Sequence, residues 1–160
     1  MWLAETLVSS HFLVLQNVFV ASILSSLKEM IAKKYRLTEK EVKKVLAKRK
    51  PFFSHTLVAN TYSNTLSYAR IGIVLSGKQT PWSVNRNAFR RLIYDLSREY
   101  IPTLKEDVVF VCKKGTILDH TDEKHLSSIA QDVRFILRWL QKIEKTHMTS
   151  HLSNISRHSS

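Results

Sequence analysis

The chain has 160 residues, of which 44% are apolar, and this size and composition suit one globular domain with terminal extensions. Its 25 lysines and arginines against 13 acids give a formal net charge of +12, which favours a polyanion as partner: nucleic acid or an acidic membrane surface. A solvated basic surface without a specific partner is the alternative. The single cysteine, Cys112, excludes an internal disulfide, and its apolar surroundings predict a buried thiol.

The N-terminal stretch is apolar and differs from the rest of the chain. Residues 7–27 contain no charge and are long enough to cross a bilayer, although polar residues interrupt them. They lack the basic start and the cleavage site of a signal peptide, so a packing helix, an interfacial helix and a membrane anchor stay open. Because the composition turns basic at Lys28, we expect residues 1–29 to be a dispensable or untranslated extension, with translation starting near Met30.

The basic segment 28–50 predicts a short amphipathic helix. Thr38 and Glu41 have the spacing of a capping box, and Pro51 is expected to stop the helix. Its apolar face consists of Val42, Val45 and Leu46.

Strands and helices alternate in the remainder of the chain. Two strands are expected over 53–62 and 68–76, paired with each other in antiparallel orientation. A helix that Ser83 could cap, a strand over 107–113 and a long helix over about 122–145 follow. This order predicts an α+β two-layer sandwich with its helices on one face of a small sheet.

The helix that begins near Ser83 has a basic face and an apolar face. Arg86 and Arg90 are four residues apart, as are Asn87 and Arg91, so these four share one side. The opposite side consists of Phe89, Leu92, Ile93 and Leu96. Packing of the apolar side turns the arginines outward, where they can bind phosphates by paired hydrogen bonds, and Asn87 can bind sugar or base edges. A solvated basic face is the alternative.

Four motifs in order give the chain a resemblance to the protein component of bacterial ribonuclease P over residues 36–142. They are Arg36-Leu37-Thr38, the strand R-I-G-I-V-L-S-G-K at 70–78, the helix R-N-A-F-R-R at 86–91 and the strand segment D-V-V-F-V-C-K-K-G at 107–115. Two positions depart from the family pattern, since Ala88 replaces an arginine and Gly77 replaces a lysine.

The resemblance implies a fold like domain 2 of ribosomal protein S5, here with an added N-terminal apolar helix. It implies a non-catalytic subunit of an endoribonuclease that removes the 5′ leader of precursor tRNA in the cytoplasm. The implied partners are the RNase P RNA and precursor tRNA, with no DNA and no membrane. Catalysis and Mg²⁺ binding would belong mainly to the RNA, so no catalytic or metal-binding residue is expected in this chain.

The resemblance also assigns binding residues. Those for RNA are Arg86, Asn87, Arg90, Arg91, Lys78, Arg98 and Arg70. Those for the leader are Val42, Leu46, Phe52, Phe53 and Asn60. Family members have aromatic residues on the first helix and first strand for base stacking, so Phe52, Phe53 or Tyr62 would have to substitute for them here.

Other interpretations remain open. The acids and histidines of 119–125 could suggest a metal site, but their place at a helix start favours capping. The Ser- and His-rich tail 146–160 is expected to be disordered, which leaves 30–145 as the RNA-binding domain. The alternative functions are a ribosome-associated RNA-binding module of similar fold and a basic membrane-associated protein anchored by residues 2–27.

Overall fold

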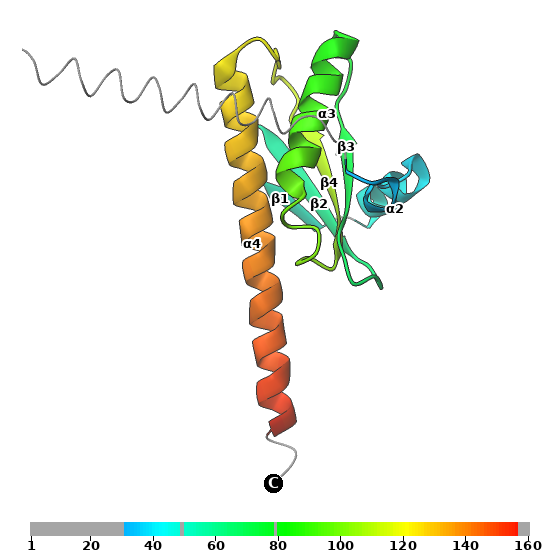
Figure 1. Ribbon diagram of the computed structural model, residues 1–160, viewed down its shortest axis with the longest axis vertical. Helices are drawn as coiled ribbons and strands as arrows, with labels where there is room; N and C mark the ends of the chain where they lie inside the picture. Colours follow the sequence, from blue (N-terminus) through cyan, green and yellow to red (C-terminus); the bar gives the residue numbers. More distant parts are fainter. Residues whose placement is uncertain (1–30, 49, 79, 157–160) are drawn as a thin grey trace, which may run out of the picture. The chain divides into compact units, whose positions relative to one another are not determined.

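A computed structural model describes residues 31–48, 50–78 and 80–156 (Figure 1). The expected N-terminal apolar helix and the extension over 1–29 lie outside these residues. The elements in chain order are the 3-10 turn η1 (Lys33–Tyr35), α2 (Glu39–Ala47), β1 (Lys50–Phe53), β2 (Leu57–Ser63), β3 (Arg70–Val74), α3 (Ser83–Ser97), β4 (Glu106–Cys112) and α4 (Glu123–Ser156).

The four strands form one sheet in the order β1-β2-β4-β3. β1 and β2, and likewise β2 and β4, are antiparallel, whereas β3 and β4 are parallel. The expected direct pairing of 53–62 with 68–76 is therefore wrong. Residues 53–62 span the end of β1 and most of β2, and the crossover through α3 inserts β4 between β2 and β3.

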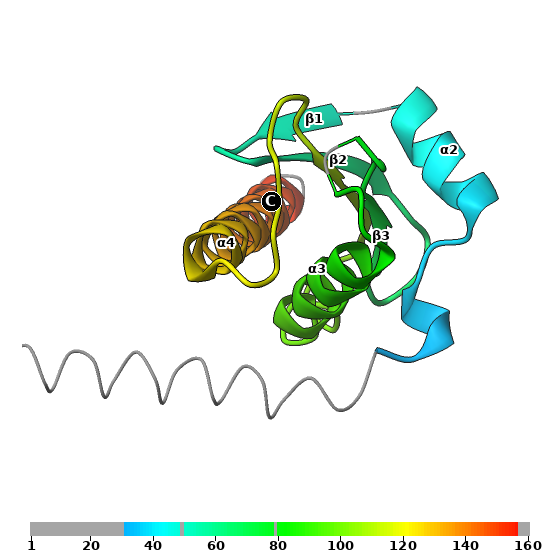
Figure 2. The same ribbon diagram turned by 90° about the horizontal axis from the view of Figure 1, so that it is seen from above.

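The helices cover both faces of this sheet. Figure 2 shows α3 and α4 side by side on one face and α2 on the other. The α+β class is confirmed, but the expectation that all helices share one face is wrong because α2 packs closely on β3 and β4. A side chain at Gly72 would come within 2.8 Å of Val42 Cγ2 and 3.1 Å of Val109 Cγ2, so the absence of a Cβ at this position permits the approach.

The main core lies between the sheet and the pair α3 and α4. It is formed by fully buried side chains that include Ile71, Phe89, Ile93, Val108, Phe110, Ile129 and Leu137. Cys112 is also buried, as the sequence predicts, and burial raises the pKa of its thiol to about 11. In the part of the chain that the structure describes, no helix is both long enough and apolar enough to span a membrane.

The helix ends agree with the sequence in one case and differ in two others. Thr38 donates its backbone N–H to Glu41 Oε2 at 2.8 Å, which confirms the capping box of α2. Pro51 does not stop this helix directly. The helix ends at Ala47, and Pro51 lies in the edge strand β1, where a missing N–H is tolerated. Ser83 is the first residue of α3 and not its N-cap, which is Trp82 and makes no side-chain capping hydrogen bond.

Helix α4 runs through Ser156, into the tail 146–160 that is predicted from its composition to be disordered. No glycine or proline occurs in Glu123–Ser156, so no residue in this stretch breaks the helical backbone. The last turns extend past the sheet, as the red end of the ribbon in Figure 1 shows.

Candidate nucleic-acid interface

The outward side of α3 carries the predicted arginines. Phe89 and Ile93 are fully buried and fix the orientation of the helix on the sheet. Asn87 and Arg91 are exposed, and Arg86 and Arg90 are half-buried. In the described part of the chain none of these three arginines forms a salt bridge with a carboxylate. Their guanidinium groups therefore remain available to an external anion.

Arg86 also connects α3 to the loop that precedes it. Its Nη1 donates to the carbonyl oxygen of Thr80 at 2.8 Å and to that of Pro81 at 3.0 Å. A Cβ at Gly77 would lie 3.9 Å from the same nitrogen, so the loop that follows β3 lies beside Arg86. The next residue, Lys78, is exposed. The loop cation and the first arginine of α3 thus belong to one region of the surface.

A further cation joins this surface from a distant part of the sequence. The guanidinium carbon of Arg36 lies 5.7 Å from the ring centre of Tyr94, which is four residues after Arg90 on α3. Burial raises the pKa of Tyr94, and the positive charges of Arg36 and Arg90 act in the opposite direction. Arg36 Nε donates to the carbonyl oxygen of Ile31 at 2.8 Å, which holds the side chain in place. Arg36 could not have been predicted from the residue spacing of α3, because it lies in a distant part of the sequence.

Arg98 and Arg70 differ from the arginines at the start of α3. Arg98 lies 3.5 Å from Asp95 on the same helix, and its side chain is half exposed. Arg70 lies in a network with two carboxylates: it donates to Asp107 Oδ1 at 2.9 Å and to Asp107 Oδ2 at 2.7 Å, and it contacts Glu41. These interactions, with Asp107 first, raise the pKa of Arg70 above its usual value. The guanidinium of Arg70 thus links α2, β3 and β4 through the two carboxylates.

Glu41 therefore serves two contacts at once. It accepts the capping hydrogen bonds of Thr38, which are the main reason why its pKa is lowered, and it pairs with Arg70. This arrangement fixes α2 over the sheet.

The residues predicted for the leader do not share one face. Strand register puts Phe53 and Asn60 on the side of α2, where Val42 and Leu46 are half-buried. Phe52 lies on the opposite side, where it contacts Phe135 and Trp139 of α4. Phe52 and Phe53 therefore lie on opposite faces of the sheet, because neighbouring residues of a strand point to opposite faces.

Asn60 is the unusual member of the α2 face. It is 3% exposed, and its Oδ1 has no hydrogen-bond partner among the described residues. An unpaired buried acceptor costs free energy. Tyr62, two residues on, lies below the ammonium groups of Lys44 and Lys48, at 5.4 and 5.5 Å from its ring centre.

The acidic segment before α4 makes capping interactions. Asp119 Oδ1 accepts hydrogen bonds from the backbone and the hydroxyl of Thr121 at 2.9 and 2.8 Å, and Asp122 Oδ1 accepts one from the backbone of Lys124 at 2.8 Å. Within the described residues no three His, Cys, Asp or Glu side chains are grouped so that they could hold a metal ion.

These features define a small basic α+β protein with arginines on a sheet-backed helix that have no carboxylate partner among the described residues. The sequence profile of the family described as Ribonuclease P matches residues 31–140. The chain therefore belongs to the Ribonuclease P family, whose function is in tRNA processing.

Solved structures show the same fold. The RNase P protein of Staphylococcus aureus is 18% identical, with a TM-score of 0.51, over 69% of this chain and 95% of its own. The RNase P protein of Thermotoga maritima is also 18% identical, with a TM-score of 0.52, over 67% of this chain and 96% of its own. The comparison with curated proteins gave no match.

Proposed function

We propose that this chain is the protein subunit of ribonuclease P, an endoribonuclease, and that it binds the catalytic RNA and precursor tRNA in the cytoplasm. Removal of the 5′ leader would be performed by the RNA subunit, with Mg²⁺ held mainly by that RNA. The mixed sheet with its β3, α3 and β4 crossover supports a fold like domain 2 of ribosomal protein S5.

The observation that carries the proposal is the set of α3 arginines that form no salt bridge within the described residues. Arg86, Arg90 and Arg91 lack carboxylate partners in the described chain, although acids are available elsewhere on the surface. A phosphate backbone supplies the missing anions, and Arg can engage it through two parallel hydrogen bonds. Asn87, Lys78 and Arg98 extend this RNA-binding surface, and Arg36 enlarges it at Tyr94.

Arg70 has a different part in the proposal. Its guanidinium is engaged by Asp107 and Glu41, so binding RNA through it would break a partly buried network. We propose that Arg70 supports the surface indirectly, by fixing α2 against β3 and β4.

The leader of precursor tRNA is proposed to bind on the α2 side of the sheet. Val42, Leu46, Phe53 and Asn60 belong to this side, and Phe53 is 65% exposed. The exposed ring of Phe53 offers a base a stacking surface. Because valine and leucine have no π-face, stacking here would be weaker than in family members with aromatic residues on the first helix.

Reconstitution with the RNase P RNA of the same organism tests the proposal. Added protein should lower the Mg²⁺ concentration that the RNA needs to cleave precursor tRNA. Substituting Arg90→Ala or Arg91→Ala should weaken RNA binding by about 1–3 kcal/mol each, measured by gel shift at fixed salt. Circular dichroism should show an unchanged fold, since both side chains lie outside the core.

Lys40→Ala is the matched control, because it removes one exposed positive charge from α2 without touching α3. It should bind RNase P RNA almost as the unmodified protein does. If cleavage and its Mg²⁺ requirement do not respond to the protein, the proposal fails, and specific binding to ribosomal RNA would favour a ribosome-associated module.

A further inference from the structure

Helix α4 has an inner and an outer face of different character. The inner face packs in the core through Ile129, Val133, Ile136, Leu137 and Leu140. The outer face carries Phe135, Arg138, Trp139 and Lys142, whose spacing of three and four residues puts them on one side of the helix. Phe135 is 58% exposed and Trp139 39% exposed. Adjacent exposed aromatic side chains mark a contact surface more often than single ones do.

A third ring comes from the sheet edge. Phe52 of β1 lies with its ring centre 4.1 Å from that of Trp139, at an interplanar angle of 28°, and 5.9 Å from that of Phe135. This stacking limits the rotation of the indole, so Trp139 is held in one orientation before a ligand arrives. Because less side-chain freedom is lost on binding, a pre-ordered ring binds more tightly than a mobile one.

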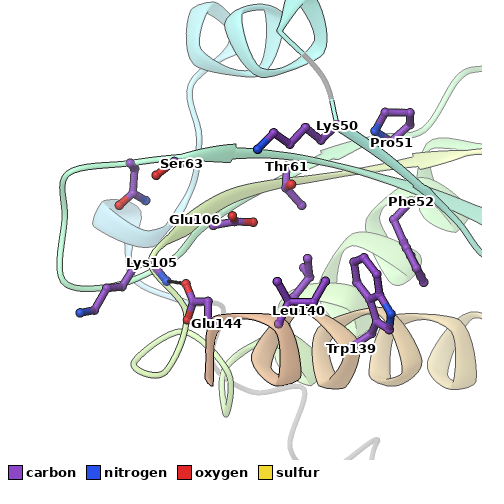
Figure 3. A pocket seen from close by; sticks show the side chains of 12 residues that line it. Lys50, Pro51, Phe52, Thr61, Ser63, Lys105, Glu106, Trp139, Leu140 and Glu144 are labelled. Atoms are coloured by element: carbon purple, nitrogen blue, oxygen red, sulfur yellow. Dashed lines mark hydrogen bonds between the residues drawn. The ribbon is translucent and has the colours of Figure 1, made fainter. Parts of the chain in front are cut away.

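A hollow of about 450 Å³ lies beside this aromatic cluster (Figure 3). Phe52 and Trp139 stand at one end of it, and Lys50 and Thr61 of the strands face Leu140 of α4 across it. Two acids line it, Glu106 and Glu144, and Glu144 accepts a hydrogen bond from the backbone N–H of Lys105 at 2.6 Å. The hollow is wide enough for part of a ligand that stacks on the rings.

The cations around the rings indicate the kind of ligand. Lys50, Arg138 and Lys142 are exposed, and none of them forms a salt bridge in the described part of the chain. Aromatic rings alternating with free cations are the arrangement by which proteins bind single-stranded nucleic acid, with bases on the rings and phosphates on the cations. A second copy of this chain would instead bring its own net charge of +12 against the same cations.

We propose that the outer face of α4 binds unpaired RNA nucleotides, with a base stacked on the Trp139 and Phe52 pair and the adjoining phosphates at Arg138 and Lys142. The inference rests on the proposed RNA-binding role and adds a contact on a different helix from the α3 arginines. The RNA would be a single-stranded segment, since bases within a duplex do not offer a free face.

Trp139 is itself the probe for this contact. In the variant Trp2→Phe/Trp82→Phe it is the sole tryptophan, and the background Arg90→Ala/Arg91→Ala weakens binding by α3. Titration with a short unstructured RNA oligonucleotide should quench the emission of Trp139, and a duplex of the same length should not. Trp139→Leu keeps an apolar side chain but loses the π-face, and it should weaken binding of the labelled oligonucleotide by about 5- to 150-fold.

Ile117→Ser is the matched control, because it removes a side chain that is 70% exposed and belongs to the loop before α4. Its oligonucleotide affinity should equal that of the parent. The inference is overturned if Trp139→Leu binds as the parent does, or if Trp139 emission does not respond to RNA. A dimer in sedimentation equilibrium that Trp139→Leu dissociates would show that a second copy occupies the face, and this too would overturn it. None of these outcomes alters the Mg²⁺ test above, so the two proposals fail separately.

Discussion

The two faces of the four-stranded sheet are built from the same strands but differ in chemistry. Toward α3 and α4, the side chains of Ile71, Val108 and Phe110 are fully buried and apolar. Toward α2, the same strands present Arg70, Asp107 and Asn60, which are polar and at least half-buried. α2 has only nine residues and leaves Phe53 exposed at the edge. The first face supplies most of the stability, whereas the second holds polar groups in fixed positions.

The largest effect is expected from deleting a side chain on the apolar face. Phe110→Ala should lower the free energy of unfolding by about 3–5 kcal/mol, because it removes a fully buried ring from the central strand β4. Its counterpart on the other face, Phe53→Ala, should change stability by no more than about 0.5 kcal/mol. Chemical denaturation measures both. Equal losses would show that the two faces contribute alike.

Breaking the ion network on the α2 face should have the next largest effect. Arg70→Met leaves Asp107, which is 4% exposed, without its cation, and stability should fall by about 3 kcal/mol. Arg91→Met is the control, since Arg91 is exposed and should tolerate the change. A combined Arg70→Met/Asp107→Leu variant should recover part of the loss. If Arg70→Met alone is neutral, the network is not structural.

Low pH should reduce the stability of the sheet face that packs on α3 and α4, because one buried carboxylate there becomes protonated. Asp132 of α4 accepts hydrogen bonds from the backbone and the hydroxyl of Thr56 at 2.6 Å, tying the turn between β1 and β2 to the helix. Burial alone would raise the pKa of Asp132, but hydrogen bonds from Ser54 and Thr56 outweigh it and the pKa is lowered. This stabilisation is therefore present above the unfolded pKa of about 3.9 and is lost as the pH falls through the folded value.

Asp132→Asn should accordingly cost about 1–2 kcal/mol at neutral pH and flatten the acid dependence of unfolding. Thermal or urea unfolding at several pH values measures both effects. An acid dependence identical to that of the unmodified protein would assign the loss of stability to other carboxylates.

The smallest expected effect has the opposite sign. Asn60→Val replaces the buried, unpaired amide oxygen with an apolar group, and the free energy of unfolding should rise by about 1 kcal/mol. If the amide takes part in leader binding, Asn60→Val should lower the affinity for precursor tRNA. The affinity for mature tRNA, which has no leader, should not change. If Asn60→Val stabilises the protein and leaves the affinity for the leader unchanged, Asn60 does not belong to the proposed leader site.

Much of the local structure could be predicted because its signals are local. The apolar spacing in α3 and α4, the capping pair Thr38 and Glu41, and the apolar run of β4 each depend on residues within a few positions of one another. The outward position of Asn87 and Arg91 follows from the same spacing. These features needed no knowledge of the neighbouring strands.

The strand order and the partners of distant residues could not be predicted in this way. No glycine or proline marks the turn at 54–56, so β1 and β2 read as one strand. The partner of Arg70 is 37 residues away, and Arg36, which forms a bridge with Ile71 of β3, meets Tyr94 only through the tertiary fold. Such contacts depend on which strands become neighbours, and hydrophobic spacing alone does not encode that choice.

The rate at which Cys112 is chemically labelled can report local opening of the sheet. It is the only thiol of the chain, and it pairs in register with Leu57 at the end of the ladder between β2 and β4. Electrophilic reagents that react with thiolates should label it only in molecules whose strands have separated at this end. The labelling rate of the intact protein would then report how often the sheet beneath α3 opens locally. Bound RNA should lower this rate.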